Sequence, residues 1–175
     1  WAGMAVAMGS GQLDVAWMGP WGYVIANSAT NCQAVAVFVG VSNSFNQKNI
    51  NKSTVDSMTE LKPIIKELKE KNYFVRACIS TAFYCPYEGK IEEQDTVNLC
   101  REFVWAGVDE LSVADTIGMA APHEAYSLFS KIKAEFKETL ITAHFHDTRK
   151  LGLANILASL QAGVDRFESS AGGLG

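Results

Sequence analysis

A repeated change of hydrophobic pattern constrains the fold of this chain more than any other feature. From residue 34 onward, short apolar runs alternate with longer segments in which apolar residues recur at helical spacing. Strands that alternate with helices in this way pair in parallel through right-handed crossovers, so the pattern predicts an α/β fold. Strands are predicted at residues 34–39, 73–80, 108–113, 140–146 and 164–169, and helices at residues 53–68, 92–105, 122–137 and 151–161.

Helix boundaries and loops are indicated by particular residues. Ser53 is a good N-cap for the first helix, and Gly107 is a typical C-cap for the second. Pro63 predicts a kink or a break inside the first helix, because proline lacks the backbone N–H that a helix interior uses. The polar segments 42–51 and 81–90 are predicted to be loops.

An internal repeat supports the order of these elements. Residues 106–111 (AGVDEL) recur as residues 162–167 (AGVDRF), each time as a helix end, a glycine cap and the start of a strand. Two architectures fit, a (β/α) barrel and an open doubly wound sheet. No G-x-G-x-x-G follows a strand, and polar residues follow every strand, which favours the carboxyl-terminal rim of a barrel. At 175 residues the chain is short for a complete barrel of about 250 residues, so it predicts a partial TIM (β/α)8 barrel of about five units.

Residues 141–148 (ITAHFHDT) run from an apolar strand into two histidines and a carboxylate. Side chains two positions apart on a strand point the same way, so His144 and His146 face one side and Phe145 faces the other. Two imidazoles presented together are a preformed pair of metal ligands. The alternative is a strand end whose histidines bond ordinary backbone groups. The third histidine, His123, is interpreted as a solvated residue in the first turn of a helix.

Composition argues against some classes of function. The formal charge of −4 gives no basic excess for binding nucleic acid. No apolar stretch reaches the length of a membrane span, so no membrane partner is expected. The start at Trp1 lacks the pattern of a signal peptide, and the true start of translation is predicted to be missing. The four cysteines form no C-x-x-C pair, which favours reduced thiols in a cytoplasmic compartment.

Residues 1–33 differ in character from the rest and are predicted to form a separate N-terminal segment, with residues 34–175 as the main domain. Residues 11–24 (GQLDVAWMGPWGYV) resemble the segment of periplasmic phosphonate-type binding proteins where a strand ends at a ligand-facing Gly-Pro turn. The alternative is an aromatic-rich strand and helix that pack on the rest. A chimera or a misjoined reading frame is one explanation of the difference.

Six short motifs occur in a characteristic order within residues 34–175. They are residues 49–51 (NIN), 85–90 (CPYEGK), 115–118 (DTIG), 144–148 (HFHDT), 153–157 (LANIL) and 169–175 (SSAGGLG). In order and spacing this part of the chain resembles the hydroxymethylglutaryl-CoA lyases of the DRE-TIM metallolyase superfamily. The CPYEGK run is specific to the lyase branch of that superfamily.

The resemblance implies a TIM barrel that cleaves 3-hydroxy-3-methylglutaryl-CoA to acetyl-CoA and acetoacetate with a divalent cation, Mg²⁺ or Mn²⁺. It implies that His144 and His146 are metal ligands. It also implies that His144, Asp115 and Thr116 are catalytic, with an imidazole taking part in proton transfer. For Thr116 the alternative is hydrogen bonding within a loop. Asp147 is interpreted as support for the histidines, or as a loop or helix-cap carboxylate.

By the same resemblance, the substrate-binding residues are Ser80, Asn49, Lys48 and Arg149. Lys48 and Arg149 are the cationic candidates for the phosphates of an acyl-CoA substrate. Ordinary solvated side chains are the alternative for these cations, and loop hydrogen bonding is the alternative for Ser80. The implied location is the cytoplasm, or the mitochondrial matrix of a eukaryote, and a homo-oligomer is compatible with the family.

The sequence departs from the family at both ends. The Asp-Arg-(Asp/Glu) motif, which supplies a metal carboxylate and an arginine, is absent. The sequence stops at Gly175, where the family continues into a loop with its catalytic cysteine and then an asparagine ligand, and Cys85 belongs to a different motif. We therefore expect little or no lyase activity from this chain alone. Two readings stay open beside the lyase: another DRE-TIM enzyme of aldolase or acyltransferase type, and a non-catalytic ligand-binding fragment.

Overall fold

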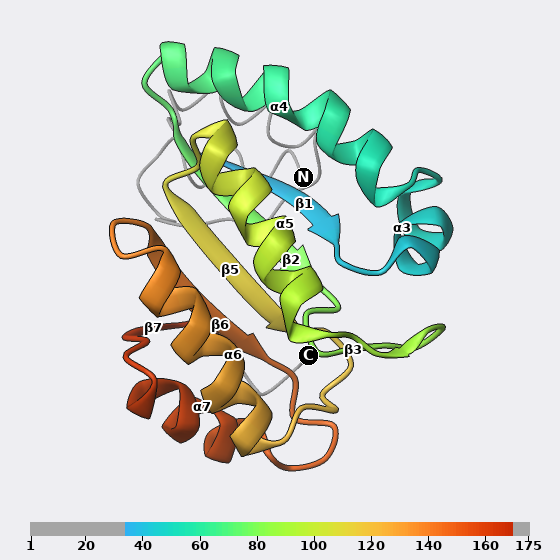
Figure 1. Ribbon diagram of the computed structural model, residues 1–175, viewed down its shortest axis with the longest axis vertical. Coiled ribbons are helices and arrows are strands. Elements are labelled where there is room, and N and C mark those ends of the chain that lie inside the picture. Colours follow the sequence, from blue (N-terminus) through green and yellow to red (C-terminus); the bar gives the residue numbers. More distant parts are fainter. Residues whose placement is uncertain (1–33, 170–175) are drawn as a thin grey trace, which may run out of the picture.

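The computed structural model describes residues 34–169, and their centre is a five-stranded sheet (Figure 1). Its strands are β1 (Ala34–Gly40), β2 (Phe74–Ser80), β5 (Glu110–Asp115), β6 (Leu140–Phe145) and β7 (Arg166–Phe167). All neighbours pair in parallel, in the order β1-β2-β5-β6-β7. Each new strand is therefore added at the same edge, whereas a doubly wound sheet reverses its order part of the way along. This topology confirms the predicted α/β class and favours the barrel arrangement.

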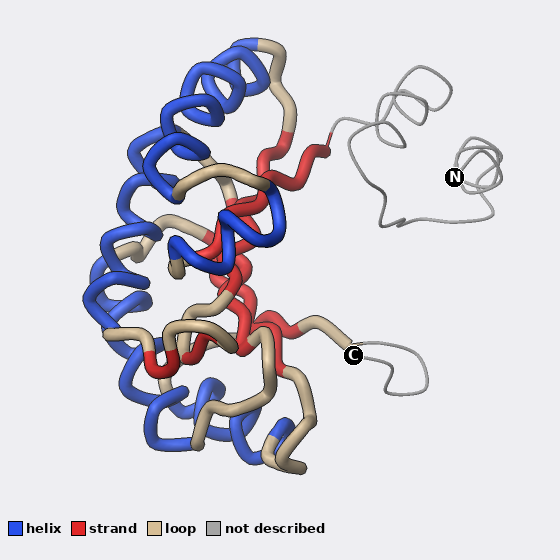
Figure 2. Tube along the Cα trace, turned by 90° about the vertical axis from the view of Figure 1, so that its right-hand side faces the viewer, coloured by secondary structure: helices blue, strands red, loops and turns tan. Residues whose placement is uncertain are grey.

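Four long helices cover one face of this sheet (Figure 2). They are α4 (Thr54–Glu70), α5 (Glu93–Ala106), α6 (Pro122–Glu135) and α7 (Gly152–Gln161). All four agree with the predicted helices to within about two residues at each end. Helices on a single face are what a barrel wall requires, because the other face of the sheet is turned toward the barrel interior. In the described part of the chain, no helix is both long and apolar enough to cross a bilayer.

The strands alternate between an apolar face and a polar face. In β2, Val75, Ala77 and Ile79 are fully buried, whereas Arg76 and Cys78 between them are partly exposed. The apolar side chains pack against the helices and form the core, in which Ile65, Phe103, Leu111, Leu128, Phe129 and Ile141 are among the largest fully buried residues. The parallel register carries this alternation across the sheet, since Arg76 lies beside Glu110 in β5. The polar face away from the helices therefore collects charged groups from several strands.

The polar segment 42–51 forms helix α3 (Asn43–Ile50), so the loop predicted there is wrong. The Ser42 hydroxyl accepts the backbone N–H of Phe45 at 3.0 Å and caps the helix. Asn46 is fully buried, and its side-chain amide accepts the N–H of Gly40 and donates to the Gly40 carbonyl, both at 2.8 Å. Polar contacts attach this helix to the end of β1, which is why hydrophobic periodicity did not reveal it.

Other boundaries also differ from the prediction. Helix α4 runs unbroken past Pro63, so a break there is wrong. The predicted loop 81–90 contains a short antiparallel hairpin of β3 (Tyr84–Cys85) and β4 (Gly89–Lys90). Strand β5 begins two residues later than predicted, and β7 is confined to Arg166–Phe167. The predictions for residues 1–33 lie outside the described residues.

Candidate functional site

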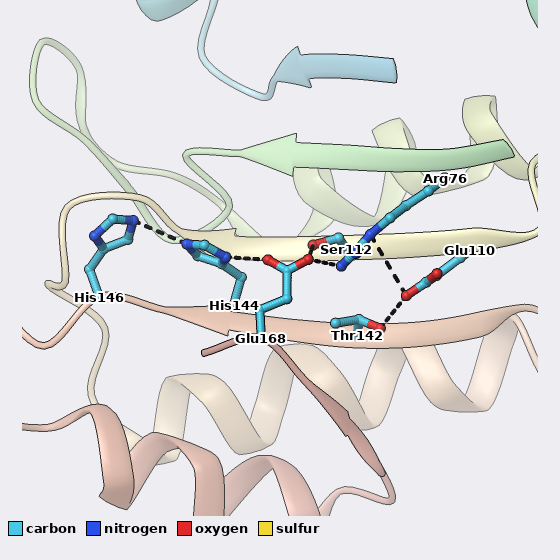
Figure 3. A network of polar contacts seen from close by, with 7 residues as sticks. All are labelled: Arg76, Glu110, Ser112, Thr142, His144, His146 and Glu168. Atoms are coloured by element: carbon cyan, nitrogen blue, oxygen red, sulfur yellow. Dashed lines mark hydrogen bonds and ion pairs between the residues drawn. The ribbon is translucent and has the colours of Figure 1, made fainter. Parts of the chain in front are cut away.

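Strand β6 brings the two histidines together at the carboxyl edge of the sheet (Figure 3). His144 lies within β6 and His146 directly follows it, and their Nε2 atoms are 3.1 Å apart. Phe145 points to the opposite side, where its ring centroid lies 6.2 Å from the ring centroid of Phe83 and 6.0 Å from that of Phe129. The alternation of a strand therefore places both imidazoles on the polar face, as the sequence predicted.

A carboxylate that sequence reasoning missed lies on the other side of His144. Glu168 follows β7, and one of its oxygens contacts Nδ1 of His144. Its other oxygen contacts the Arg76 guanidinium from β2 and accepts the hydroxyl of Ser112 at 3.3 Å. Figure 3 shows these groups as one row, from Arg76 through Glu168 and His144 to His146. A charged residue within an otherwise apolar strand was the available signal for Arg76.

Arg76 has a second carboxylate partner. Its Nε lies 3.7 Å from Oε1 of Glu110, and the hydroxyl of Thr142 donates to that same oxygen. Glu110 is largely buried, so its charge needs a nearby cation to offset the cost of leaving water. Arg76 supplies that charge to Glu110 and to Glu168 together. The polar face of the sheet is therefore an ordered network rather than a set of separate solvated side chains.

Burial and nearby positive groups favour a neutral His144, and the Glu168 carboxylate beside Nδ1 opposes them. Burial lowers the pKa of this imidazole, and the nearby His146 and Arg76 lower it further, since each disfavours a second positive charge. A neutral imidazole keeps one nitrogen lone pair, which is the form that binds metal ions. His144 is therefore in a suitable state to act as a ligand near neutral pH.

Asp115 and Thr116 lie at the same edge of the sheet, where they order loops. The Asp115 carboxylate accepts the backbone N–H groups of Met119 at 3.0 Å and Ala120 at 3.1 Å. Burial raises the pKa of Asp115, although these two hydrogen bonds oppose the shift. The Thr116 hydroxyl accepts the N–H of Thr81 at 2.7 Å. These contacts match the loop role left open for Thr116, and a catalytic role for either residue stays a prediction.

The predicted substrate-binding residues are spread along this edge. Ser80 is largely buried at the end of β2, and its carbonyl accepts the N–H of Val41 at 2.9 Å. Lys48 and Asn49 are exposed on α3, with the Lys48 ammonium 4.9 Å from the ring centroid of Tyr87. Arg149 is exposed after β6 and donates to the carbonyl of Met119 at 3.4 Å. Their roles toward a substrate stay predictions.

The hairpin that contains residues 85–90 (CPYEGK) makes two side-chain contacts with the start of α3. The Cys85 thiol donates to the Ser42 hydroxyl at 2.9 Å, and the Glu88 carboxylate accepts the N–H of Ser44 at 2.7 Å. Both contacts attach the hairpin to the start of α3. Cys85 is buried, and this contact gives it a structural role in the hairpin.

Asp147 caps the helix that follows the histidines. Its carboxylate accepts the N–H of Gly152 at 2.9 Å, and this hydrogen bond is the main cause of its lowered pKa. The geometry supports the helix-cap interpretation of Asp147 and fixes the loop directly after His146.

The spacing of the two imidazoles suits a shared metal ion. The Nε2 atoms of His144 and His146 lie 3.1 Å apart, close enough for one ion to contact both. Within residues 34–169 no group of three or more His, Cys, Asp or Glu side chains is placed to hold a metal ion. The described part therefore brings two candidate ligands together.

Fold and site together define a class: a β/α-barrel protein with a candidate metal site at the carboxyl ends of its strands. Residues 22–175 match the family model described as HMGL-like, and the chain belongs to this family. The resemblance to hydroxymethylglutaryl-CoA lyases is thereby confirmed.

Individual relatives agree with this assignment. The chain is 41% identical over 139 residues to hydroxymethylglutaryl-CoA lyase YngG of Bacillus subtilis, covering 79% of this chain and 46% of that protein. The crystal structure of the Bacillus subtilis HMG-CoA lyase superposes with a TM-score of 0.82 at 38% identity, over 90% of this chain and 52% of that one. An Acinetobacter baumannii HMG-CoA lyase in complex with coenzyme A and 3-methylmalate gives a TM-score of 0.80 at 31% identity, over 89% of this chain and 50% of that one. The chain spans about half the length of the relatives that it matches.

Proposed function

We propose that this chain carries part of the active site of a metal-dependent carbon-carbon lyase. The proposed reaction cleaves 3-hydroxy-3-methylglutaryl-CoA to acetyl-CoA and acetoacetate. The observation that carries the proposal is the pair of imidazoles, His144 and His146, held 3.1 Å apart at the carboxyl edge of a barrel-type sheet. Membership of the HMGL-like family and the similarity to named lyases support it.

The family implies a divalent metal ion, and we propose Mg²⁺ or Mn²⁺ held by the Nε2 atoms of His144 and His146. When bound, such an ion acts as a Lewis acid that lowers the pKa of the tertiary alcohol of the substrate. The protein's own contribution is to hold the two ring nitrogens close together at the edge of the sheet before the ion arrives. Water, the substrate or residues outside the described part supply the remaining positions.

The neighbouring residues position the substrate. Asp115 and Thr116 hold the loops after β5 and β2 in place beside the imidazole pair, and Ser80 lies at the end of β2 along the same edge. Lys48 and Arg149 provide exposed cations on the loops and helix that follow strand ends, where the phosphates of coenzyme A would bind. Asn49 offers an amide beside Lys48.

The location and assembly of the complete protein are also proposals. Named relatives from Homo sapiens include a cytoplasmic and a mitochondrial lyase, and we propose the cytoplasm or the mitochondrial matrix for this one. An acyl-CoA thioester is the proposed small-molecule partner, and a homo-oligomer remains compatible with it.

Metal binding by the histidine pair tests the proposal. Titration of the 175-residue chain with Mn²⁺, followed by calorimetry, should give one site that His144→Ala or His146→Ala weakens at least about 10-fold, because each variant removes one of two protein ligands. His123 is exposed on α6 and provides the matched control, so His123→Ala should leave the Kd unchanged. Equal Mn²⁺ affinity in all four proteins would contradict the proposed site.

A product assay tests the reaction class. The complete protein that contains these residues, with Mn²⁺ and the lyase substrate, is compared with the same protein offered acetyl-CoA and pyruvate-type oxo-acids. Acetoacetate formation abolished by His144→Ala supports the lyase. Condensation products from the oxo-acid would show a related enzyme of aldolase or acyltransferase type.

A further inference from the structure

The contact between Glu168 and His144 determines which ring nitrogen carries the proton. An ionised carboxylate only accepts hydrogen bonds, so the Nδ1 atom that faces it has to be the donor. Arg76 lies against the other oxygen of Glu168 and favours its ionised form. A neutral imidazole protonated at Nδ1 carries its lone pair on Nε2, which is the atom that faces His146.

We propose that Glu168, held by Arg76, is a positioning residue that fixes His144 as its Nδ1–H tautomer and so presents the Nε2 lone pair at the metal position. The metal part of this inference rests on the proposed function, whereas the tautomer part does not. A carboxylate behind a metal-binding histidine commonly sets its tautomer and ring orientation, and loss of such a group typically weakens metal binding about 10- to 100-fold.

The two histidines then have different roles before metal binding. Their Nε2 atoms are 3.1 Å apart, within hydrogen-bond distance. Because His144 offers a lone pair there, His146 has to donate from Nε2, so a neutral His146 is the Nε2–H tautomer. An ion held by both Nε2 atoms would require His146 in its other tautomer, with the proton moved from Nε2 to Nδ1 through solvent and no net release. His144 is the preset ligand, and His146 is the ligand that changes tautomer.

The arrangement also explains why Arg76 and Glu168 are brought together from distant parts of the chain. Arg76 lies on β2, and Glu168 follows β7, on the far side of β5 and β6. Ser112 on β5 donates to Glu168 at 3.3 Å. Both groups that hold the carboxylate come from the β2–β5 side of β6, whereas the Glu168 backbone follows β7 on the other side, so the position of the carboxylate depends on the sheet being assembled.

Nitrogen NMR of the imidazole rings measures the tautomers directly in the metal-free, 175-residue chain. The chain has three histidines, so His144→Ala, His146→Ala and His123→Ala assign every signal. We expect a protonated Nδ1 in His144 and a protonated Nε2 in His146. In Glu168→Ala, His144 should shift toward the Nε2–H tautomer, whereas Glu168→Gln, whose amide oxygen still accepts, should retain Nδ1–H. A wild-type His144 without a proton on Nδ1, or one unchanged in Glu168→Ala, would overturn the proposal.

Calorimetric Mn²⁺ titration of the same proteins gives the second readout. Glu168→Ala should raise the Kd about 10- to 100-fold, and Glu168→Gln should raise it less, because it keeps the tautomer. Glu138 is an exposed carboxylate outside the network, and Glu138→Ala should leave the Kd unchanged.

The outcomes separate the two proposals. The expected tautomers without Mn²⁺ binding in the wild type would overturn the proposed function and leave the positioning role standing. Measurable Mn²⁺ binding of equal affinity in the wild type and in Glu168→Ala would overturn the metal part of the inference and leave the proposed function standing. Should Glu168→Ala fail to fold, the wild-type tautomers and the isosteric Glu168→Gln variant still decide the matter.

Discussion

Arg76 lies between two carboxylates on the polar face of the sheet, with Glu168 against its guanidinium and Glu110 at 3.7 Å. Arg76→Leu would leave both carboxylates facing each other without a cation. Removing one partner of a buried ion pair costs about 3–5 kcal/mol, and we expect about 2–3 kcal/mol here because 27% of the Arg76 side chain is exposed. Urea denaturation at pH 7 measures this change. The control is Lys62→Leu, which breaks the more exposed ion pair with Glu102 on the surface and should cost under about 1 kcal/mol. Equal losses of unfolding free energy in the two variants would show that Arg76 stabilises the fold no more than an exposed ion pair does.

At the scale of elements, Gly118 joins the turn after β5 to the loop after β6. Its φ is +65°, and a Cβ there would lie 2.8 Å from the backbone nitrogen of Thr148, two residues beyond His146. Gly118→Ala should therefore lose at least about 2 kcal/mol of stability and should also weaken Mn²⁺ binding, because it displaces the loop beside the histidines.

Gly89 is the matched control, since its φ is +77° and nothing lies within 4 Å of its Cβ position. Gly89→Ala should cost only about 1 kcal/mol and leave Mn²⁺ affinity unchanged. Similar losses of affinity in both variants would contradict the coupling of the two loops.

The helices and strands that bury an apolar face could be predicted from the sequence, whereas elements held by polar contacts could not. Strands and long helices were found because each buries an apolar face, and burial leaves a periodic pattern. Helix α3 was missed because the buried Asn46 amide attaches it through polar contacts with Gly40. The imidazole pair was predicted because it depends only on alternation along one strand. Glu168 was missed because its contact with His144 depends on which strands lie side by side, and no local pattern records that.

Across the whole molecule, leucine side chains in the core between the sheet and the helices are buried, whereas leucine side chains on the outer face of α7 are exposed. Leu111 in β5 is fully buried, whereas Leu153, Leu157 and Leu160 on α7 are 83%, 59% and 50% exposed. Leu111→Ala should therefore lower the free energy of unfolding by about 2–5 kcal/mol, and Leu157→Ala by under about 0.5 kcal/mol. Urea denaturation of the 175-residue chain distinguishes these values. A loss above about 1 kcal/mol for Leu157→Ala would mean that this face of α7 is covered when the chain folds.

The relatives are about twice as long as this chain, so the test also asks whether this half of a barrel behaves as an independent unit.

We propose that His144 and His146 hold one divalent ion through their ring nitrogens. Pulsed electron paramagnetic resonance of Mn²⁺ bound to the chain labelled with ¹⁵N-histidine tests it most directly, because nuclei bonded to the ion modulate its signal. We expect coupling from two histidine nitrogens, reduced to one in His144→Ala or His146→Ala and unchanged in His123→Ala. A Mn²⁺ signal with water coupling alone would contradict it.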